Sequence, residues 1–318
     1  MDMSVTSKLA RRTMLGGGAA LASVGALSYA AYRRFPLFFE QYVSEMKLPI
    51  LPPPRVPDPG KWPDKGVHSA WLGHSTVLLK VDGYTVLTDP VFSDRAGIDL
   101  MLFTVGVKRM VAPALSIRQL PHVDLILVSH AHMDHLDTPS LRKLESKATE
   151  VVMASHTSDL IRPERYGRVT ELGWGQRARA GAASVTAFEV RHWGARMQTD
   201  TYRGYNGYVI EINKRRIVFA GDTALTDTFR AVRAGGAVDL AIMPIGAYNP
   251  WIRVHCSPEQ AWRMVNDAGA EYVLPVHHRT FHLSREPLEE PLGRLLSAAG
   301  RGAGRVALHG IGDEFHLS

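Results

Sequence analysis

The chain has 318 residues, of which 45% are hydrophobic and 21% charged, a composition typical of a folded globular protein rather than a disordered one. Lys and Arg exceed Asp and Glu by 37 to 31, a net charge of +6. No dense basic stripe or arginine-rich arm occurs in the sequence, so we expect no nucleic-acid partner. A mildly basic surface does suit an anionic lipid head group. The single cysteine, Cys256, excludes an internal disulfide and a multi-cysteine zinc site, so any metal must be held by histidine and carboxylate side chains.

Residues 1–34 are expected to direct export or anchoring rather than to form part of the fold. Arg11 and Arg12 precede an uncharged run from Met14 to Tyr32 that is rich in Gly, Ala and Leu, a pattern that resembles a twin-arginine export signal. The run is also long enough for a transmembrane anchor, and its small-residue cleavage candidate ends at Ala30. We therefore expect a protein exported to the periplasm or anchored in the inner membrane facing outward, with cleavage left open.

Residues 35–63 are expected to connect this segment to the domain. Between residues 35 and 48, apolar side chains recur at helical spacing and predict an amphipathic helix with one aromatic face. That face suits packing on the protein's own core, which we favour, or contact with a membrane surface. The stretch from Pro49 to Pro63 contains seven prolines and predicts a semi-rigid strap. The residues of the aromatic face are Phe35, Phe38, Phe39, Tyr42 and Met46.

Strands and helices alternate over residues 64–318, which predicts one α/β domain. Two stretches, 74–90 and 205–223, have apolar runs on both sides of a polar turn and predict two similar hairpins. Each is followed by a short buried strand, at 123–130 and 238–246, so the domain is expected to contain two related halves. Two halves of this kind facing each other form a four-layer α/β/β/α sandwich, with functional residues at the strand ends where loops converge.

Two helices have clear start signals. Thr138 is expected to cap a helix that has Pro139 at its first position. A second helix has Ser257 as N-cap, Gln260 at the capping-box position and Gly269 as its stop.

A buried strand over residues 125–129 runs directly into His130, His132, Asp134 and His135, in the pattern H-x-H-x-D-H. Side chains two residues apart project to the same side of an extended backbone, so His130 and His132 are suited to hold one ion. The turn into the next helix directs Asp134 and His135 toward a second ion beside the first. The alternative is a set of surface or capping residues, but the residues after the motif already supply the helix cap.

The stretch "SHAHMDHLD" resembles the signature of the metallo-β-lactamase superfamily of binuclear metallohydrolases, whose fold is the sandwich predicted above. Further matches follow in order: "WLGHSTVLL", "LTDPVFSDRAG", "RHWGAR", "FAGDTAL", "GAYNP" and "PVHHRTF". This set is similar to the branch that contains N-acylphosphatidylethanolamine-hydrolysing phospholipase D and its bacterial relatives. The resemblance spans about residues 48–291.

The resemblance implies the remaining metal ligands. His192 would complete the first site, Asp222 would bridge both ions, and His277 would complete the second site, with Asp134 also assigned to catalysis. His278 stands where the relatives carry Trp-Gly, but adjacent strand-end residues point to opposite sides, and the flanking sequence favours His277. Five imidazoles and two carboxylates suit two divalent ions, most readily Zn²⁺, with Fe and Mn as alternatives. Two such ions make a bridging hydroxide available as nucleophile near neutral pH.

Two further residues are candidates for a supporting role at the metal ligands. His74 and Asp89 lie at corresponding turns of the first half of the domain. Each is suited to orient a metal ligand or to stabilise its own turn.

Four residues are candidates for contact with the substrate. Tyr248 and His255 flank a loop where the phospholipase branch keeps substrate-contacting groups, and His255 is suited to donate a proton to the leaving group or to contact a phosphate. Arg279 is a candidate phosphate contact. Arg196 is suited to bind an anionic group or to support the fold.

These residues predict a metal-dependent phosphodiesterase that acts on lipids of the N-acylphosphatidylethanolamine type and releases phosphatidic acid and an N-acylethanolamine. A lactonase, β-lactamase or other ester or amide hydrolase on the same metal site is the second hypothesis, because fold does not decide between substrates. A membrane-anchored scaffold stabilised by its metals is the third. The predicted partners are a phospholipid or other small ester and a membrane surface.

Overall fold

The computed structural model describes residues 44–45, 47–99 and 104–318. The chain divides into two compact units, Met1–Leu48 and Pro49–Ser318. The expected export segment lies outside the described residues, as does most of the expected amphipathic helix, including all five residues of its aromatic face. Among the helices that are described, none has both the length and the apolar character needed to span a bilayer.

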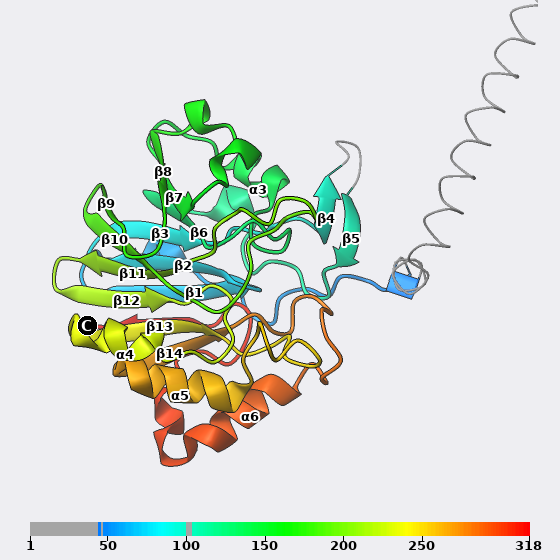
Figure 1. Cartoon of the computed structure of the whole chain (residues 1–318), viewed down its shortest axis with the longest axis vertical. Helices are drawn as coiled ribbons and strands as arrows, with labels where there is room; N and C mark the ends of the chain where they lie inside the picture. The colour runs from blue at the N-terminus through cyan, green and yellow to red at the C-terminus, as the bar shows by residue number, and fades with distance from the viewer. Residues whose placement is uncertain (1–43, 46, 100–103) are drawn as a thin grey trace, which may run out of the picture. The chain divides into compact units, whose positions relative to one another are not determined.

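The larger unit contains two main sheets that face each other (Figure 1). The first has seven strands in the order β15 (Glu314–Leu317), β1 (Val67–Gly73), β2 (Thr76–Val81), β3 (Tyr84–Thr88), β6 (Leu125–Val128), β7 (Glu150–Ala154) and β8 (Arg168–Leu172). The second has six in the order β14 (Ala270–Val276), β13 (Val238–Pro244), β12 (Arg215–Phe219), β11 (Gly207–Ile212), β10 (Ala183–Phe188) and β9 (Arg177–Ala180). A separate hairpin pairs β4 (Arg95–Asp99) with β5 (Thr104–Lys108).

Helices cover the outer faces of both sheets, which confirms the predicted four-layer sandwich (Figure 1). The α-helices are α3 (Thr138–Lys143), α4 (Thr228–Ala234), α5 (Pro258–Ala268) and α6 (Glu290–Ala299). Short 3₁₀ helices lie at Pro59–Lys61, Ile117–Gln119, Ser158–Leu160, Pro163–Arg165 and Gly300–Arg305. One core cluster includes apolar residues of both sheets, such as Leu78 and Ile210, and a second joins the other face of the second sheet to α4, α5 and α6. Strands such as β1 and β6 are therefore buried along their whole length, because both of their faces are covered.

The two halves repeat one pattern of strand pairing. From β1 to β2, β3, β6 and β7, successive neighbours pair antiparallel, antiparallel, parallel and parallel. The series β10, β11, β12, β13 and β14 pairs in the same way. This agrees with the related halves expected from the two hairpins, and it places Asp89 after β3 and Asp222 after β12 at equivalent strand ends.

The predicted local signals are largely confirmed. Ser257 caps α5 in a capping box with Gln260, and Gly269 ends the helix with φ +65°. The expected cap at Thr138 was wrong by one residue: Thr138 is already helical and Asp137 occupies the N-cap position. Instead of bonding to the helix backbone, the Asp137 carboxylate accepts hydrogen bonds from the hydroxyls of Ser93 and Ser140.

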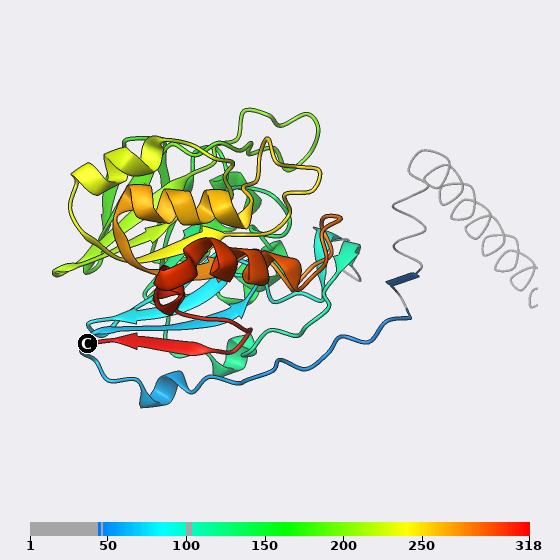
Figure 2. The same ribbon diagram turned by 90° about the horizontal axis from the view of Figure 1, so that it is seen from below.

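The proline-rich strap belongs to the larger compact unit, which starts at Pro49. Figure 2 shows it running along the edge of the first sheet beside β15. Arg55 pairs with Asp313 at 2.8 Å, and the indole of the buried Trp62 donates to Glu314 at 2.6 Å. These contacts fasten the strap to the sheet.

Candidate metal centre

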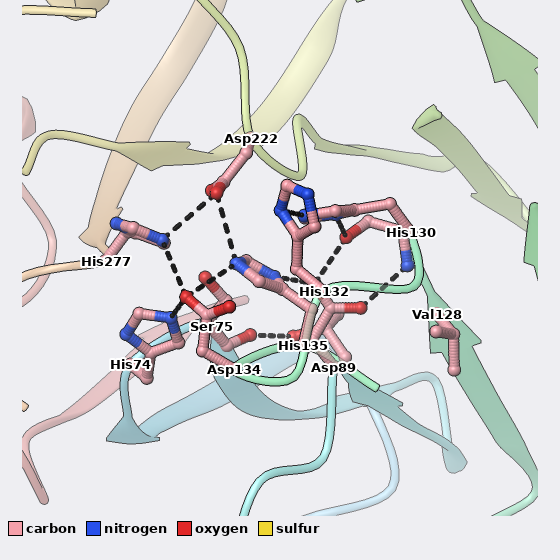
Figure 3. A network of polar contacts seen from close by, with 12 residues as sticks. His74, Ser75, Asp89, Val128, His130, His132, Asp134, His135, Asp222 and His277 are labelled. Atoms are coloured by element: carbon pink, nitrogen blue, oxygen red, sulfur yellow. Dashed lines mark hydrogen bonds and ion pairs between the residues drawn. The ribbon is translucent and has the colours of Figure 1, made fainter. Parts of the chain in front are cut away.

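Four loops that leave the carboxyl ends of strands carry the predicted ligands, and Figure 3 shows Asp222 and His277 pointing toward Asp134 and His135. The loop after β6 carries the H-x-H-x-D-H motif, and the loops after β10, β12 and β14 supply one residue each. The structure brings together all seven residues that the sequence assigned to metal binding. They are His130, His132, Asp134, His135, His192, Asp222 and His277.

Three imidazole nitrogens form the first group. His130 Nε2 lies 2.8 Å from His132 Nδ1, which lies 3.2 Å from His192 Nε2. Nitrogen ligands about 2.0–2.1 Å from a tetrahedral zinc ion stand about 3.3 Å apart. The spacing of these nitrogens therefore suits one divalent ion.

The second group lies next to the first. Asp134 Oδ2 is 3.6 Å from His135 Nε2 and 3.5 Å from His277 Nε2. Asp222 Oδ2 is 3.1 Å from each of these two nitrogens and 3.7 Å from His192 Nε2. Asp222 therefore stands between the groups, where a carboxylate can serve two ions at once.

Several inward-facing atoms of this cluster lack a hydrogen-bond partner in the described part of the chain, although they are buried. Such atoms are costly in a folded protein unless a ligand or ion satisfies them. The donor set of imidazole and carboxylate is the chemistry that divalent metals prefer, so the residues present fit metal binding. These unpartnered atoms include His135 Nε2, Asp222 Oδ1, His255 Nδ1 and His277 Nε2.

The surrounding histidines keep the carboxylates of Asp222 and Asp134 ionised. Burial would raise the pKa of Asp222, but the neighbouring charges of His135 and His277 hold it well below its usual range. The pKa of Asp134 is set in the same way: burial opposes ionisation, and the charge of His135 together with the nearby rings of His277 and His74 keeps this pKa well below the usual range. Both carboxylates are therefore ionised at neutral pH.

The predicted histidine ligands differ in the direction of their pKa shift. Burial lowers the pKa of His130 and of His192 well below the ordinary value, so their ring nitrogens are unprotonated at neutral pH. Burial also acts on His135, but the carboxylates around it, Asp222 first among them, raise its pKa well above the ordinary value. Burial likewise opposes protonation of His277, but Asp222 and Asp134 raise its pKa to about 9.

Asp89 and His74 contact the predicted ligands. Asp89 is fully buried, and its carboxylate accepts from His135 Nδ1 at 2.6 Å and from the amide and hydroxyl of Ser129 at 2.7 and 2.6 Å. His74 Nε2 lies 3.0 Å from Asp134 Oδ2. Both residues therefore occupy the orienting positions that the sequence had left open, as a histidine ligand commonly donates its second ring N–H to a carboxylate.

Sharp backbone turns direct these side chains inward. His74, Asp89 and His277 have φ of +51°, +31° and +63°, a region that costs free energy for any residue other than glycine. Gly221, before Asp222, has φ +59°, and a Cβ there would stand 2.7 Å from Ser129 Cβ. Tertiary packing holds these turns at the ends of their strands.

His255 joins the cluster, whereas Tyr248 does not contact the predicted ligands. His255 Nδ1 is 3.7 Å from Asp222 Oδ2, close enough that His192, Asp222 and His255 form a further possible ligand group. Tyr248 donates its hydroxyl to Glu290 at 2.8 Å.

The two arginines are engaged elsewhere. Arg279 pairs with Glu289 and donates to the His309 carbonyl at 2.7 Å, so the expected phosphate contact is not supported. Arg196 donates to the carbonyls of Ala131 and Leu136 at 2.9 and 2.8 Å, which favours the structural alternative for this residue. It clamps both ends of the motif loop.

His278 points away from the cluster and stacks on Trp71 with ring centroids 4.5 Å apart. The choice of His277 over His278 therefore agrees with the geometry.

Sequence reasoning missed three residues beside the ligands. Ser129 contacts His130 Nδ1 at 2.9 Å, and the Val254 carbonyl lies 2.8 Å from His192 Nδ1, so both histidine rings are held by their second nitrogen. Trp193 packs its ring 4.4 Å from that of His192. The only signal in the sequence was adjacency to a predicted ligand for Ser129 and Trp193, and Val254 carried none.

Comparison with known proteins bears on this arrangement. The model of the "Beta-lactamase superfamily domain" matches residues 84–278, a range that includes all seven predicted ligands. An uncharacterized protein of Mycobacterium tuberculosis is 37% identical over 240 residues, which cover 72% of this chain and 63% of that protein. The chain therefore spans less than two thirds of the length of that relative.

Two relatives carry a functional name. The N-acyl-phosphatidylethanolamine-hydrolyzing phospholipase D 1 of Caenorhabditis elegans is 29% identical over 250 residues, covering 73% of this chain and 69% of the relative. The mitochondrial protein of that name from Saccharomyces cerevisiae is 32% identical over 242 residues, covering 72% and 51%. Among solved structures, the metallo hydrolase Igni18 of Ignicoccus hospitalis superposes with a TM-score of 0.61 at 20% identity, over 80% of this chain and 99% of that one.

Two facing sheets with a histidine and aspartate cluster at one end give this chain the same fold as Igni18. The chain belongs to the metallo-β-lactamase superfamily. Its cluster of histidine and aspartate side chains is able to bind metal ions.

Proposed function

We propose that the protein is a binuclear phosphodiesterase of the phospholipase D type that acts on N-acylphosphatidylethanolamine-like lipids. The observation that carries the metal chemistry is the clustering of imidazole and carboxylate side chains from four loops, several of which have buried donor atoms without a hydrogen-bond partner among the described residues. The substrate class is supported by the names of the relatives in Caenorhabditis elegans and Saccharomyces cerevisiae, whose matched regions each cover more than 70% of this chain.

The residues have distinct tasks in this proposal. His130, His132 and His192 would hold one divalent ion, and Asp134, His135 and His277 the other, with Asp222 shared. Zn²⁺ suits these ligands best, and Fe or Mn is compatible with them. Two ions bound there would supply hydroxide near neutral pH and polarise a phosphoryl oxygen. Asp89, His74 and Arg196 would position the ligands through the contacts described above.

His255 is proposed to contact the substrate. Burial lowers the pKa of His255 to about 4, so the ring is neutral at pH 7. A neutral imidazole suits a hydrogen bond to a phosphoryl oxygen better than transfer of a full proton to the leaving group. Of the two roles expected for His255, we therefore favour phosphate contact.

Residues 1–34 are proposed to export the protein or to anchor it facing outward, which would bring the site to membrane lipids. The uncharged run after Arg11 and Arg12 supports this.

Hydrolysis assays on the purified full chain loaded with zinc test the proposal. N-acylphosphatidylethanolamine in mixed detergent micelles is the first substrate, and a lactone and β-lactam panel is run beside it. Asp222→Asn should abolish release of N-acylethanolamine, a loss of at least about 100-fold for a residue serving both ions. The control is His156→Gln. His156 follows β7, which corresponds to β14 in the other half of the domain, but it is exposed and lies outside the cluster.

The outcomes separate the hypotheses. Lipid cleavage by the wild type and by His156→Gln, but not by Asp222→Asn, supports the phospholipase. Turnover of a lactone or β-lactam without lipid cleavage refutes the substrate and keeps the metal chemistry. Two bound metals with no turnover of any substrate favour the scaffold.

A further inference from the structure

Large apolar side chains are exposed around the metal centre, although the core is well filled. Trp193 is 42% exposed, Met197 51%, Trp251 51%, Ile252 42% and Leu288 40%. A single exposed apolar residue is ordinary, but several on neighbouring loops mark an interaction surface. We call these five residues, together with Arg253 and Arg285, the mouth patch.

The loop of Trp193 and the loop of Trp251 both adjoin the predicted ligands. The Trp193 ring lies 4.5 Å from that of His132 and 6.4 Å from that of His255. The amide of His255 donates to the Trp251 carbonyl at 2.9 Å. Both exposed tryptophans therefore belong to loops that contact His255.

The loop after β14 completes the patch. The amide of Arg285 donates to the Asn249 carbonyl at 2.9 Å, which ties this loop to the one that carries Trp251. Leu288 lines the same small cavity as His277. In Figures 1 and 2 the loops after β10, β13 and β14 project at the same end of the sandwich.

The patch also carries positive charge. Arg253 and Arg285 are exposed, and within the described ranges no hydrogen bond or ion pair engages either guanidinium, whereas Arg279 nearby is paired with Glu289. Indole rings favour the boundary between water and lipid, and arginine binds lipid phosphates. The combination therefore matches the surface of an anionic bilayer.

The chain enters the unit at this same end. Leu51 donates its amide to the Met110 carbonyl at 2.8 Å, and Met110 donates to Thr280 at 2.8 Å, three residues beyond His277. Residues before Pro49 contain the uncharged run expected to export or anchor the protein. A tether in that part of the sequence would leave from the end that carries the metal centre.

We infer that the mouth patch docks on an anionic lipid bilayer with the metal centre facing the lipid. The inference rests on the proposed function and names the surface from which its substrate is drawn. A second copy of this chain is the competing occupant, but a twofold contact through the patch would bring Arg253 and Arg285 of both copies together, and like charges disfavour it.

Quenching of tryptophan fluorescence by brominated lipid tests this directly. The zinc-loaded full chain is mixed with phosphatidylcholine and phosphatidylglycerol vesicles that contain no N-acylated lipid. Residues 1–48 contain no tryptophan, so insertion of that segment alone gives no signal. We expect strong quenching in the wild type and loss of most of it in the Trp193→Phe/Trp251→Phe variant.

A second pair of variants keeps every tryptophan. Ile252→Ser with Arg253→Gln should reduce the quenching and its dependence on phosphatidylglycerol. Val56→Ser, which alters a residue 62% exposed on the strap, should leave quenching unchanged. Thermal midpoints and metal content show that each variant is folded.

Three results would overturn the inference. They are absence of quenching in the wild type, equal quenching in the double tryptophan variant, and a dimer that Ile252→Ser/Arg253→Gln dissociates while no quenching occurs. Docking without turnover of micellar substrate refutes the proposed function alone, and turnover without docking refutes the docking alone.

Discussion

Substitution of Asp89 by asparagine should weaken metal binding at one group of ligands and spare the other. The Asp89 carboxylate is fully buried and holds His135 through a hydrogen bond of 2.6 Å to Nδ1. Asparagine has the same shape and can still accept from Ser129, but its amide nitrogen would face the N–H of His135, donor against donor. Loss of one buried bond to a charged group costs about 1.5–3 kcal/mol. That corresponds to about a 10- to 100-fold weaker affinity for the ion held by His135, since 1.4 kcal/mol is about tenfold.

Titration of metal-free protein with zinc in the presence of a competing chelator measures the two affinities separately. The ion held by His130, His132 and His192 should bind as in the wild type. Asp124→Asn is the matched control, because Asp124 accepts from Thr85 N at the opposite end of the same pair of strands. Unchanged affinity at both sites in Asp89→Asn, or equal weakening at both, would refute the assignment of Asp89 to His135.

Three further results are expected. The pKa values of His135 and His277 are raised in the metal-free protein, to about 9 for His277, so both rings carry a proton at pH 7. Zinc binding should therefore release about two protons, measurable with a pH indicator, and zinc affinity should rise with pH. Zinc binding without proton release would contradict this. Arg196→Met should lower the thermal midpoint and the metal content without raising KM selectively, because Arg196 bonds the ends of the motif loop; a pure increase in KM would restore the substrate-binding role. His278→Phe should retain metal and activity, since the ring stacks on Trp71, and metal loss in this variant would place His278 among the ligands.

Local signals in the sequence predicted much of the fold. The two hairpins, the strands that follow them and the capped helix α5 depend on contacts between near neighbours, and all are present. The H-x-H-x-D-H motif behaves in the same way, because four ligands on one loop need only the strand before it and the helix after it to point inward. The shift from Thr138 to Asp137 at the start of α3 is the size of error expected at a helix end.

Long-range geometry decided the rest. An isolated His192, Asp222 or His277 has no local signature, and only the family resemblance assigned them. Pairing of β10 to β14 brings the three to the same end of the sandwich as the motif loop.

The partners of two arginines also depended on tertiary structure. From the sequence, Arg279 was a candidate phosphate contact and Arg196 was suited either to bind an anion or to support the fold. A guanidinium reaches far, so its partner depends on what packs beside it. Arg279 pairs with Glu289, and Arg196 donates hydrogen bonds to carbonyls of the motif loop. The residue types of the site were therefore determined by the sequence, while the partner of each long side chain was decided by tertiary packing.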